Sequence, residues 1–412
     1  MASIYANAYF TIAATNSGDA SGGCFRNTSD KYVSKLLPGY KDTYVRHKLP
    51  KFPYMSNEHE IGNSPEWPLL SRGWAYQEIR LSPRVLHFCA EEVVWVCRDY
   101  QKSESMDNDE TFTYDDEWTK TGYPYTPYGI LEKHPRYLWY RTVKEYSRLR
   151  LSRGDDKMAA LSGLAKQMQD LRLGDRYLVG LWEKTLLLDL LWNVEGYHSA
   201  PKSRIARYPT WSWASSPYQV EWESGVQGLN IPLDCTRVED IKVTNRGPSH
   251  MADCVEAKIT LMAPLLDASS LLTAYQAREV ASLGSGSTAR PQPFDHLYPE
   301  PYDAVITNLD HLYVSLYKSD GGSFIRDITS AGLSGCLIPL AAGYEFSSDI
   351  DAIHVQKEHS SGCYRRVGRA TLSHAVTTSY KQWYEFRNRY QENKSTVRRL
   401  IDYLPTQRIT LI

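Results

Sequence analysis

The chain has 412 residues, and its 47 Lys and Arg against 48 Asp and Glu give a formal net charge of −1 at pH 7. Hydrophobic residues make up 42% and charged residues 23%, which is typical of a soluble globular protein and excludes a disordered or fibrous one. The balanced charge argues against a nucleic-acid binder, because such proteins neutralise phosphates with a basic surface. We expect no membrane span, since no run of 18 uncharged apolar residues occurs.

The first residues predict a helix followed by a strand. The helix covers residues 1–8, with apolar positions at the i, i+3, i+4, i+7 spacing of one helical face. Residues 9–14 (YFTIAA) then read as a buried strand. Residues 26–68 are polar and interrupted by prolines, so we expect a long irregular segment with one strand at most.

A compact helix–strand–strand pattern follows. Residues 71–80 predict a short helix that carries Trp74 and Glu78 one turn apart, and Pro83 ends it. Residues 84–88 and 92–97 alternate as two strands with a turn between them. Residues 1–100 are therefore expected to form one domain.

The middle of the chain divides into a loop and a helical region. Residues 101–129 are acidic and rich in Tyr and Pro, which favours a loop. Residues 130–200 predict three helices, and Asp155 is a candidate N-cap for the second. The apolar stripes of these helices are Trp139, Val143, Tyr146 and Leu149; Met158, Leu161, Ala165 and Met168; and Leu178, Leu181, Trp182, Thr185, Leu188 and Leu191.

In the last part of the chain, hydrophobic residues recur at every second position, which is the period of a β-strand. Residues 201–376 therefore predict an antiparallel β-rich region, and residues 377–412 predict a C-terminal helix with mixed charges over 378–403. The candidate strands are Thr210–Ala214, Lys258–Ala263, His311–Tyr317, Gly335–Pro339, Ile353–Gln356 and Tyr364–Arg369. The fold class is thus α+β, with a helical layer in the middle of the sequence.

The densest group of polar and aromatic residues is Arg72, Gly73, Trp74, Gln77 and Glu78. Glu78 on the same helix face as Trp74 could be partly desolvated, with a raised pKa, and act as a general base or bind a ribose. In the structural alternative, which propensity favours, Trp74 packs into the core while Arg72 pairs with Glu78 or a backbone carbonyl.

Other candidate sites are weaker. His87 and Cys89 share one strand face and could form a nucleophile pair, although buried strand residues are the commoner explanation. Trp211, Trp213 and Trp222 could be stacking platforms of a carbohydrate-binding module. The seven cysteines have no CxxC spacing, so we expect no metal site, free thiols and, without a signal peptide, a reducing cytoplasmic location.

Several segments together resemble the fungal heterokaryon incompatibility (HET) domain family. Residues 1–15 (MASIYANAYFTIAAT) resemble its Met-x-x-Ile-Tyr-x-Asn-Ala helix and Thr-Ile-Ala-Ala strand. Residues 70–88 resemble its Arg-Gly-Trp-x-x-Gln-Glu block and the Leu-Ser-Pro-Arg segment after it. Residues 208–215 (YPTWSWAS) resemble the Pro-Ser/Thr-Trp-Ser-Trp-Ala motif, and residues 364–368 (YRRVG) resemble the Tyr-x-Arg-x-Gly element.

The resemblance implies a cytosolic protein of fungal allorecognition that triggers programmed cell death through contacts with other proteins, and a homo-oligomer is possible. The family's Ser-Tyr-x-Trp-Gly and Trp-Ile-Asp blocks have no counterpart here. Residues 1–100 therefore resemble a partial domain with the α/β fold of Toll/interleukin-1 receptor (TIR) domains, and we expect a truncated copy, with an inactive copy as one alternative. TIR likeness also implies cleavage of NAD as a substrate, with Glu78 assisting the departure of nicotinamide.

Overall fold

The computed structural model describes residues 1–50, 52, 66–97, 100–106, 110–111, 135–194, 202–222, 231–245, 251, 254–267, 312–318, 335–342, 350–374, 401 and 404–412. It is a mixed α+β protein with several sheets and few helices, as expected at this coarse level. The chain divides into two compact units, one made of residues 1–180 with 249–253 and the other of residues 181–248 with 254–412.

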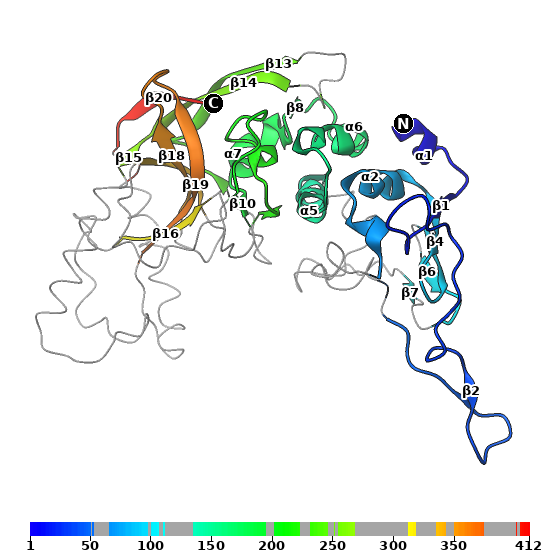
Figure 1. Cartoon of the computed structure of the whole chain (residues 1–412). Coiled ribbons are helices and arrows are strands. Elements are labelled where there is room, and N and C mark those ends of the chain that lie inside the picture. The colour runs from blue at the N-terminus through cyan, green and yellow to red at the C-terminus, as the bar shows by residue number, and fades with distance from the viewer. Residues whose placement is uncertain are drawn as a thin grey trace, which may run out of the picture. The chain divides into compact units, whose positions relative to one another are not determined.

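The first unit contains a five-stranded sheet, which lies to one side of the helices α2, α5 (Pro135–Ser147) and α6 (Ser162–Leu171) (Figure 1). Its order is β1-β4-β5-β6-β7, and β1 runs parallel to β4 whereas the other neighbours are antiparallel. A parallel pair needs a crossover connection, and α2 supplies its helix. The bounds are β1 Thr11–Ala13, α2 Gly73–Leu81, β4 Arg84–Phe88, β5 Val93–Cys97, β6 Tyr100–Ser103 and β7 Glu110–Thr111.

The predicted helix and the two strands after it are confirmed within one or two residues by α2, β4 and β5. The inner sheet face and α2 share one apolar core, because alternate strand residues point to the same face. Its buried members include Ala13, Ala75, Ile79, Val85, Val94 and Val96. By contrast, β6 and β7 lie partly in residues 101–129, which were expected to be a loop; residues 112–134 lie outside the described part.

The N-terminal segment is less buried than predicted. The helix is shorter, α1 at Ala2–Ala6, and none of its residues is buried. The buried strand expected over 9–14 is wrong in extent and environment, because β1 has three residues and only Ala13 is buried. As the first strand of the sheet, β1 packs one face inward and leaves Ile12 57% exposed. Between β1 and α2 lie the exposed pair β2 Lys35–Leu36 and β3 Tyr44–Val45 and the short helix η1 Pro68–Ser71.

The first predicted helix of the middle region is confirmed as α5 (Pro135–Ser147), and its stripe residues Trp139, Val143 and Tyr146 are buried. The second begins later than expected, as α6 (Ser162–Leu171), so Asp155 is not its N-cap. Two short 3-10 turns, η2 Gly154–Asp156 and η3 Ala159–Leu161, precede it.

The third predicted helix, over residues 178–191, is wrong. Val179 and Gly180 have φ angles of 48° and 95°, a left-handed backbone that ends any right-handed helix. Its apolar residues are nonetheless buried, in short elements. These elements are β8 Tyr177–Leu178, β9 Leu181–Trp182, η4 Glu183–Thr185 and α7 Leu186–Asp189.

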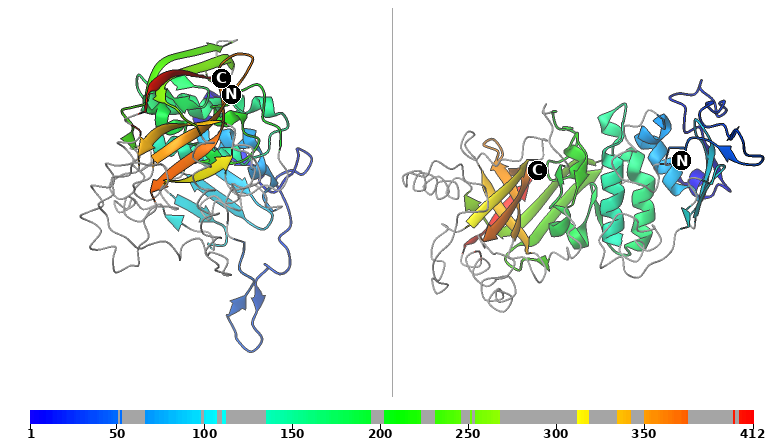
Figure 2. Two further views of the ribbon diagram at one scale, coloured as in Figure 1. Left: turned by 90° about the vertical axis from the view of Figure 1, so that its left-hand side faces the viewer. Right: turned by 90° about the horizontal axis from the view of Figure 1, so that it is seen from below.

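The second unit contains a mostly antiparallel sheet of nine strands among the described residues (Figures 1 and 2). Its main path is β12-β17-β18-β19-β20-β14-β13, while β15 pairs with β17 and β16 with β19. β10 Asn193–Val194 and β11 Val220–Glu221 form a separate two-stranded sheet. The bounds are β12 Ile231–Pro232, β13 Arg237–Asn245, β14 Cys254–Pro264, β15 Leu266–Asp267, β16 Leu312–Lys318, β17 Cys336–Ala342, β18 Ile350–Lys357, β19 Tyr364–His374 and β20 Thr406–Leu411.

Two local predictions for this unit are wrong. Residues 210–214 form no strand, and the short 3-10 helix η5 (Trp213–Ser215) takes their place. The C-terminal helix expected over 377–412 does not reach the end of the chain, because β20 pairs with β14 inside the sheet. Residues 375–400 lie outside the described part. The other five candidate strands are confirmed. Three of them lie inside the longer strands β14, β18 and β19, and the other two overlap β16 and β17 with a shift of one residue at the start.

Candidate functional site

Backbone hydrogen bonds hold the segment that contains the predicted site residues against the residues after α5. Gly73 begins α2, and its N–H donates to the carbonyl of Arg150 at 2.8 Å, while the N–H of Arg150 donates to the carbonyl of Ser71 at 2.8 Å. A Cβ atom on Gly73 would lie 2.7 Å from Cδ2 of Leu151. The glycine therefore allows the start of α2 to lie directly against the segment that follows α5.

Gln77 joins α2 to α6. Its side chain is 3% exposed, and its Oε1 accepts a hydrogen bond from the N–H of Gly163 at 2.5 Å. A Cβ atom on Gly163 would lie 2.7 Å from this oxygen and 2.7 Å from Cβ of Ala2. Gln77 and Gly163 thus form a close contact between helices, and the amide oxygen satisfies an N–H at the start of α6.

The other residues of the predicted site lie nearer the surface. Arg72 is exposed, while Trp74 and Glu78 are half-buried. Arg72 and Glu78, both described, form no ion pair with each other, so this part of the structural alternative is wrong. Instead Glu78 interacts with Tyr5 of α1: burial, the charge of Glu78 and a hydrogen bond to it raise the pKa of Tyr5.

A half-buried charged cluster that sequence reasoning missed lies beside this segment. The hydroxyl of Tyr76 donates to Oε2 of Glu145 at 2.8 Å, and Nε of Arg141 donates to Oε1 at 2.9 Å. Burial acts to raise the pKa of Glu145, but the charges of Arg141 and Arg80, with these hydrogen bonds, outweigh it and lower the pKa. The i, i+4 spacing of Arg141 and Glu145 was the available sequence signal.

His87 and Cys89 are structural rather than nucleophilic. Nδ1 of His87 lies 2.9 Å from the hydroxyl of Thr15, and burial lowers the pKa of His87 to about 3. Burial, followed by the charge of Glu92, raises the pKa of Cys89 to about 12. A hydrogen bond from Trp67 acts in the opposite direction but is the smaller effect. A neutral thiol is a poor nucleophile, so the alternative of buried strand residues accounts for this pair.

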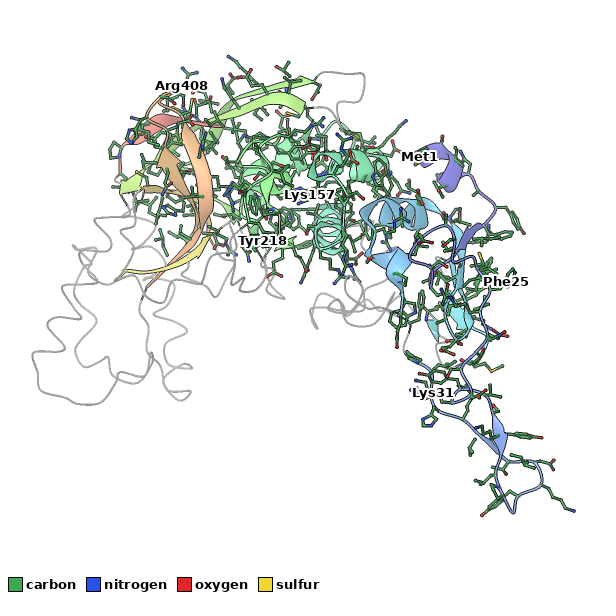
Figure 3. All side chains as sticks on the ribbon, viewed as in Figure 1. Met1, Phe25, Lys31, Lys157, Tyr218 and Arg408 are labelled. Atoms are coloured by element: carbon green, nitrogen blue, oxygen red, sulfur yellow. The ribbon has the colours of Figure 1, made fainter. Side chains whose placement is uncertain are left out.

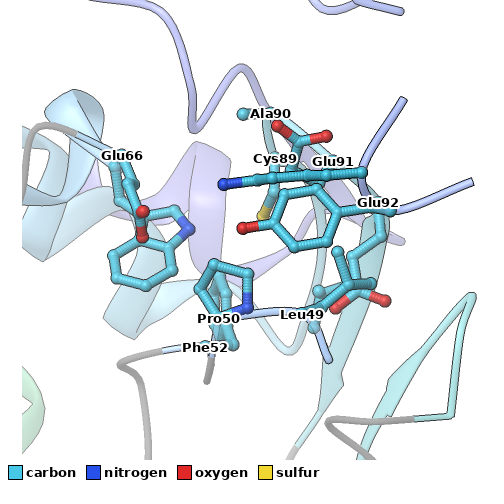
Figure 4. Close-up of a pocket in the computed structure, with 12 residues that line it drawn as sticks. Leu49, Pro50, Phe52, Glu66, Cys89, Ala90, Glu91 and Glu92 are labelled. Atoms are coloured by element: carbon cyan, nitrogen blue, oxygen red, sulfur yellow. The ribbon is translucent and has the colours of Figure 1, made fainter. Parts of the chain in front are cut away.

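A pocket of about 90 Å³ opens next to the turn between β4 and β5. Figure 4 shows Glu66 on one side and Cys89 and Glu91 on the other. Lys31 also lines it, and its pKa is raised chiefly by Tyr32 and further by Glu91 and Glu66. The cavity has room for a few water molecules, and neither Trp74 nor Glu78 is among the residues that line it.

The tryptophans of the second unit are not a stacking platform. Trp211 and Trp213 are completely buried and Trp222 is nearly so. The indole N–H of Trp192 donates to the carbonyl of Trp211 at 2.9 Å, and the hydroxyl of Ser212 caps η5 by accepting from the N–H of Ala214. No indole face here can reach a sugar, so the carbohydrate-binding hypothesis is wrong.

A buried arginine organises the surroundings of these tryptophans. The guanidinium of Arg366 lies 3.7 Å from the ring centroid of Trp192, and its Nε donates to the carbonyl of Leu190 at 3.2 Å. Its Nη2 donates to the carbonyl of Trp192. The backbone N–H of Arg366 donates to the hydroxyl of Thr210 at 3.0 Å. Arg366 on β19 is therefore joined directly to the segment that contains Trp211 and Trp213.

Comparisons with known proteins bring no relative: no family model, no curated protein and no solved structure matches the chain. Within the described ranges, no group of three or more His, Cys, Asp and Glu side chains could hold a metal ion. No helix in the same ranges is long and apolar enough to cross a membrane.

Proposed function

We propose that the chain is a HET-type protein of fungal allorecognition, which signals programmed cell death in the cytosol through contacts with other proteins. The observation that carries the proposal is that segments resembling the family, although far apart in the sequence, meet in space. A set of chance matches would have no reason to be in contact.

The first pair of segments meets in the first unit. Residues 1–15 supply α1 and β1, and residues 70–88 supply α2 and β4. Tyr5 interacts with Glu78, the Thr11 hydroxyl lies 2.7 Å from that of Ser82, and β1 pairs with β4. The parallel β1–α2–β4 unit is the part of the sheet that supports a TIR-like α/β domain, because such domains are built from parallel strands joined by helices; the other three strand pairs are antiparallel.

The second pair meets in the second unit. Residues 208–215 contribute Thr210, and residues 364–368 contribute Arg366, and these two residues share a hydrogen bond. The two segments thus share one packed contact: the Arg366 side chain donates to a carbonyl beside the tryptophans, and the Thr210 hydroxyl accepts from the backbone N–H of Arg366.

Inducible expression in a filamentous fungus tests the proposal. We expect the chain to kill hyphal compartments, scored with a vital dye. We expect Arg72→Ala and Trp74→Ala to reduce killing, because the Arg72 side chain is exposed and that of Trp74 is half-buried, so both motif side chains reach the surface. Arg153→Ala, another exposed arginine of the first unit, is the matched control. Full viability with the folded wild-type protein present would identify an inactive copy and contradict the proposal that this chain signals cell death.

A second candidate is cleavage of NAD assisted by Glu78. The interaction with Tyr5 favours it, because a hydrogen bond to a half-buried carboxylate holds that group in one orientation. Purified wild-type, Glu78→Gln and Glu183→Gln proteins would be incubated with NAD and nicotinamide release measured; Glu183 is an exposed control in the second unit. We expect release by the wild type and the control alone. Equal release by all three proteins, or none, would remove this candidate.

A further inference from the structure

A basic hairpin extends from the first unit. It consists of residues 31–48, with β2 and β3 as its two short strands, and Figures 1 and 2 show it reaching away from the sheet that contains β4 and β6. Residues 31–48 contain five Lys or Arg and one Asp, a formal net charge of +4, although the whole chain carries −1. Positive charge is therefore concentrated on one projecting segment.

The end of the basic hairpin is a defined turn. The N–H of Tyr40 donates to the carbonyl of Leu37 at 3.1 Å, with Pro38 and Gly39 between them. Gly39 has a φ angle of 88°, which the third position of a type II turn requires and which glycine adopts without strain. The N–H of Leu37 also donates to the carbonyl of Thr43 at 2.8 Å. The turn thus places Tyr40 at the end of the hairpin, where it is 61% exposed.

The base of the basic hairpin is attached to the sheet of the same unit. The N–H of His47 donates to the carbonyl of Lys31 at 3.2 Å and closes the base. Nη2 of Arg46 donates to the carbonyl of Ser105, two residues after β6, at 3.3 Å. Figure 3 shows Lys31 at this base and side chains that stand out from the ribbon beyond it. The hairpin is therefore a fixed projection of the domain.

Apolar side chains are exposed on both faces of the basic hairpin. Leu36 pairs with Tyr44, so these two side chains lie on one face, while Lys35 pairs with Val45 on the other face. Tyr44 is 64% exposed, Leu36 49% and Val45 48%. The surface of one protein partner would cover one face of a hairpin, whereas the interface of a bilayer surrounds any segment that enters it. The arrangement therefore favours a membrane over a protein.

Single-stranded nucleic acid has the same negative charge but fits the apolar residues less well. Its bases could stack on Tyr40 and Tyr44. The aliphatic side chains of Leu36 and Val45 offer no ring for stacking, although they are exposed beside these tyrosines. Both aliphatic and aromatic side chains are suited to the headgroup region of a bilayer, where Tyr keeps its hydroxyl in contact with water.

We propose that the basic hairpin binds the surface of membranes that contain anionic lipids. Its end, with Leu36, Tyr40 and Tyr44, enters the headgroup region, and its cations, Lys35 and Lys41 among them, bind the anionic groups of the lipids. Binding is peripheral and reversible, because the apolar residues are few and the attachment depends on both kinds of contact. This inference goes beyond the proposed function and does not depend on it.

Co-sedimentation of the full chain with lipid vesicles tests the proposal. Vesicles of phosphatidylserine and phosphatidylcholine in equal parts should bind the wild type, and vesicles of phosphatidylcholine alone should not. The double variant Lys35→Glu/Lys41→Glu should bind the anionic vesicles at least about tenfold more weakly, because each cation near an anionic surface strengthens binding about fivefold. Lys102→Glu/Lys166→Glu is the matched control, since it changes the net charge equally at two exposed lysines of the same unit.

A second pair of variants tests the apolar contact. Tyr44→Ser should weaken binding to the anionic vesicles at least about threefold, because less apolar surface then leaves water. Tyr9→Ser, at an exposed tyrosine of the same unit outside the hairpin, should not. Circular dichroism establishes that each variant is folded, and Tyr40→Ser replaces Tyr44→Ser if it is not.

Four results would each overturn the proposal. They are equal or absent binding of the wild type to the two kinds of vesicle, an equal loss with the control lysines, unchanged binding of the hairpin tyrosine variant, and tighter binding to a single-stranded oligonucleotide or to polyglutamate than to anionic vesicles. The last result would assign the hairpin to a nucleic acid or to an acidic protein instead.

Discussion

Replacing Gln77 with methionine removes the hydrogen bond from the N–H of Gly163 to Gln77, which joins α2 to α6. Methionine has a similar length and can occupy the same buried space, but it cannot accept a strong hydrogen bond from the N–H of Gly163. The substitution leaves this N–H in the first turn of α6 without its side-chain acceptor. It therefore tests whether Gln77 acts by bonding or only by filling space.

The expected cost follows from the burial of the pair. Gln77 is 3% exposed and Gly163 is buried, so water has little access to replace the lost acceptor. A buried donor left without a partner costs about 1–3 kcal/mol. Methionine is more apolar than glutamine and recovers part of that, so we expect a net loss of about 1–2 kcal/mol. The ratio of unfolded to folded protein then rises about tenfold.

Urea unfolding, followed by hydrogen exchange of peptides from α2 and α6, measures this loss in the first unit. The exchange readout is needed because a chain of two compact units need not unfold in one step. Gln167→Met is the control: it is the same substitution on α6, at an exposed position. A loss no larger for Gln77→Met than for Gln167→Met would refute the assignment of a bonding role to Gln77.

Three further changes test other contacts. Gly73→Ala should destabilise the first unit by about 1–3 kcal/mol in urea unfolding, because the new Cβ would lie 2.7 Å from Leu151; an unchanged midpoint would contradict this. Arg366→Lys should cost the second unit about 1–3 kcal/mol by the same assay, since an ammonium cannot stack on Trp192 and donate to two carbonyls as the planar guanidinium does; wild-type stability would count against it. Burial lowers the pKa of His87 from 6.5 to about 3, so the unfolded chain binds its proton more readily and stability should fall by up to about 1.4 kcal/mol per pH unit as the pH falls from about 6.5 to about 3. His87→Gln should remove that part of the pH dependence, and an unaltered profile would show that another group causes it.

Local patterns predicted the elements whose partners are near in sequence. The alternation over residues 84–97 and the proline that ends the preceding helix are sufficient to place α2, β4 and β5, because each depends on neighbouring residues alone. The stripe of α5 is likewise confirmed, since Trp139, Val143 and Tyr146 recur at helical spacing and are buried.

The misplaced elements are those in which backbone conformation overrides periodicity. Residues 178–191 have a helical apolar stripe, yet Val179 and Gly180 adopt positive φ angles and break the segment into short pieces. Their apolar side chains are buried regardless, so the pattern correctly predicted burial and not the type of element. Residues 404–412 were expected to continue a helix, but they pair with β14, which lies about 150 positions earlier in the chain. This distant partner, and not the local pattern, determines their conformation.

The candidate site, too, could be predicted from the sequence only in part. Motif residues such as Gln77 could be singled out from the sequence, but their partners could not, because Gly163 lies 86 positions away. The cluster around Glu145 and the pocket beside Cys89 also bring together residues from several elements. Their charges had appeared in the sequence as ordinary solvated residues, and only tertiary packing changes their environment.

The motif residues of the two units have a common role: they determine how segments of the chain pack against each other. Gly73, Gln77 and Arg366 each act through the backbone of another segment: Gly73 by the absence of a side chain, Gln77 by accepting from an N–H, and Arg366 by donating to carbonyls. None of the three is positioned to touch a ligand. Their spacing thus predicts how the chain packs, and the proposed signalling would then depend on residues that packing leaves at the surface, such as Arg72 and Ile12. Substitutions of the first kind should lower stability and function together, and substitutions of the second kind should lower function alone.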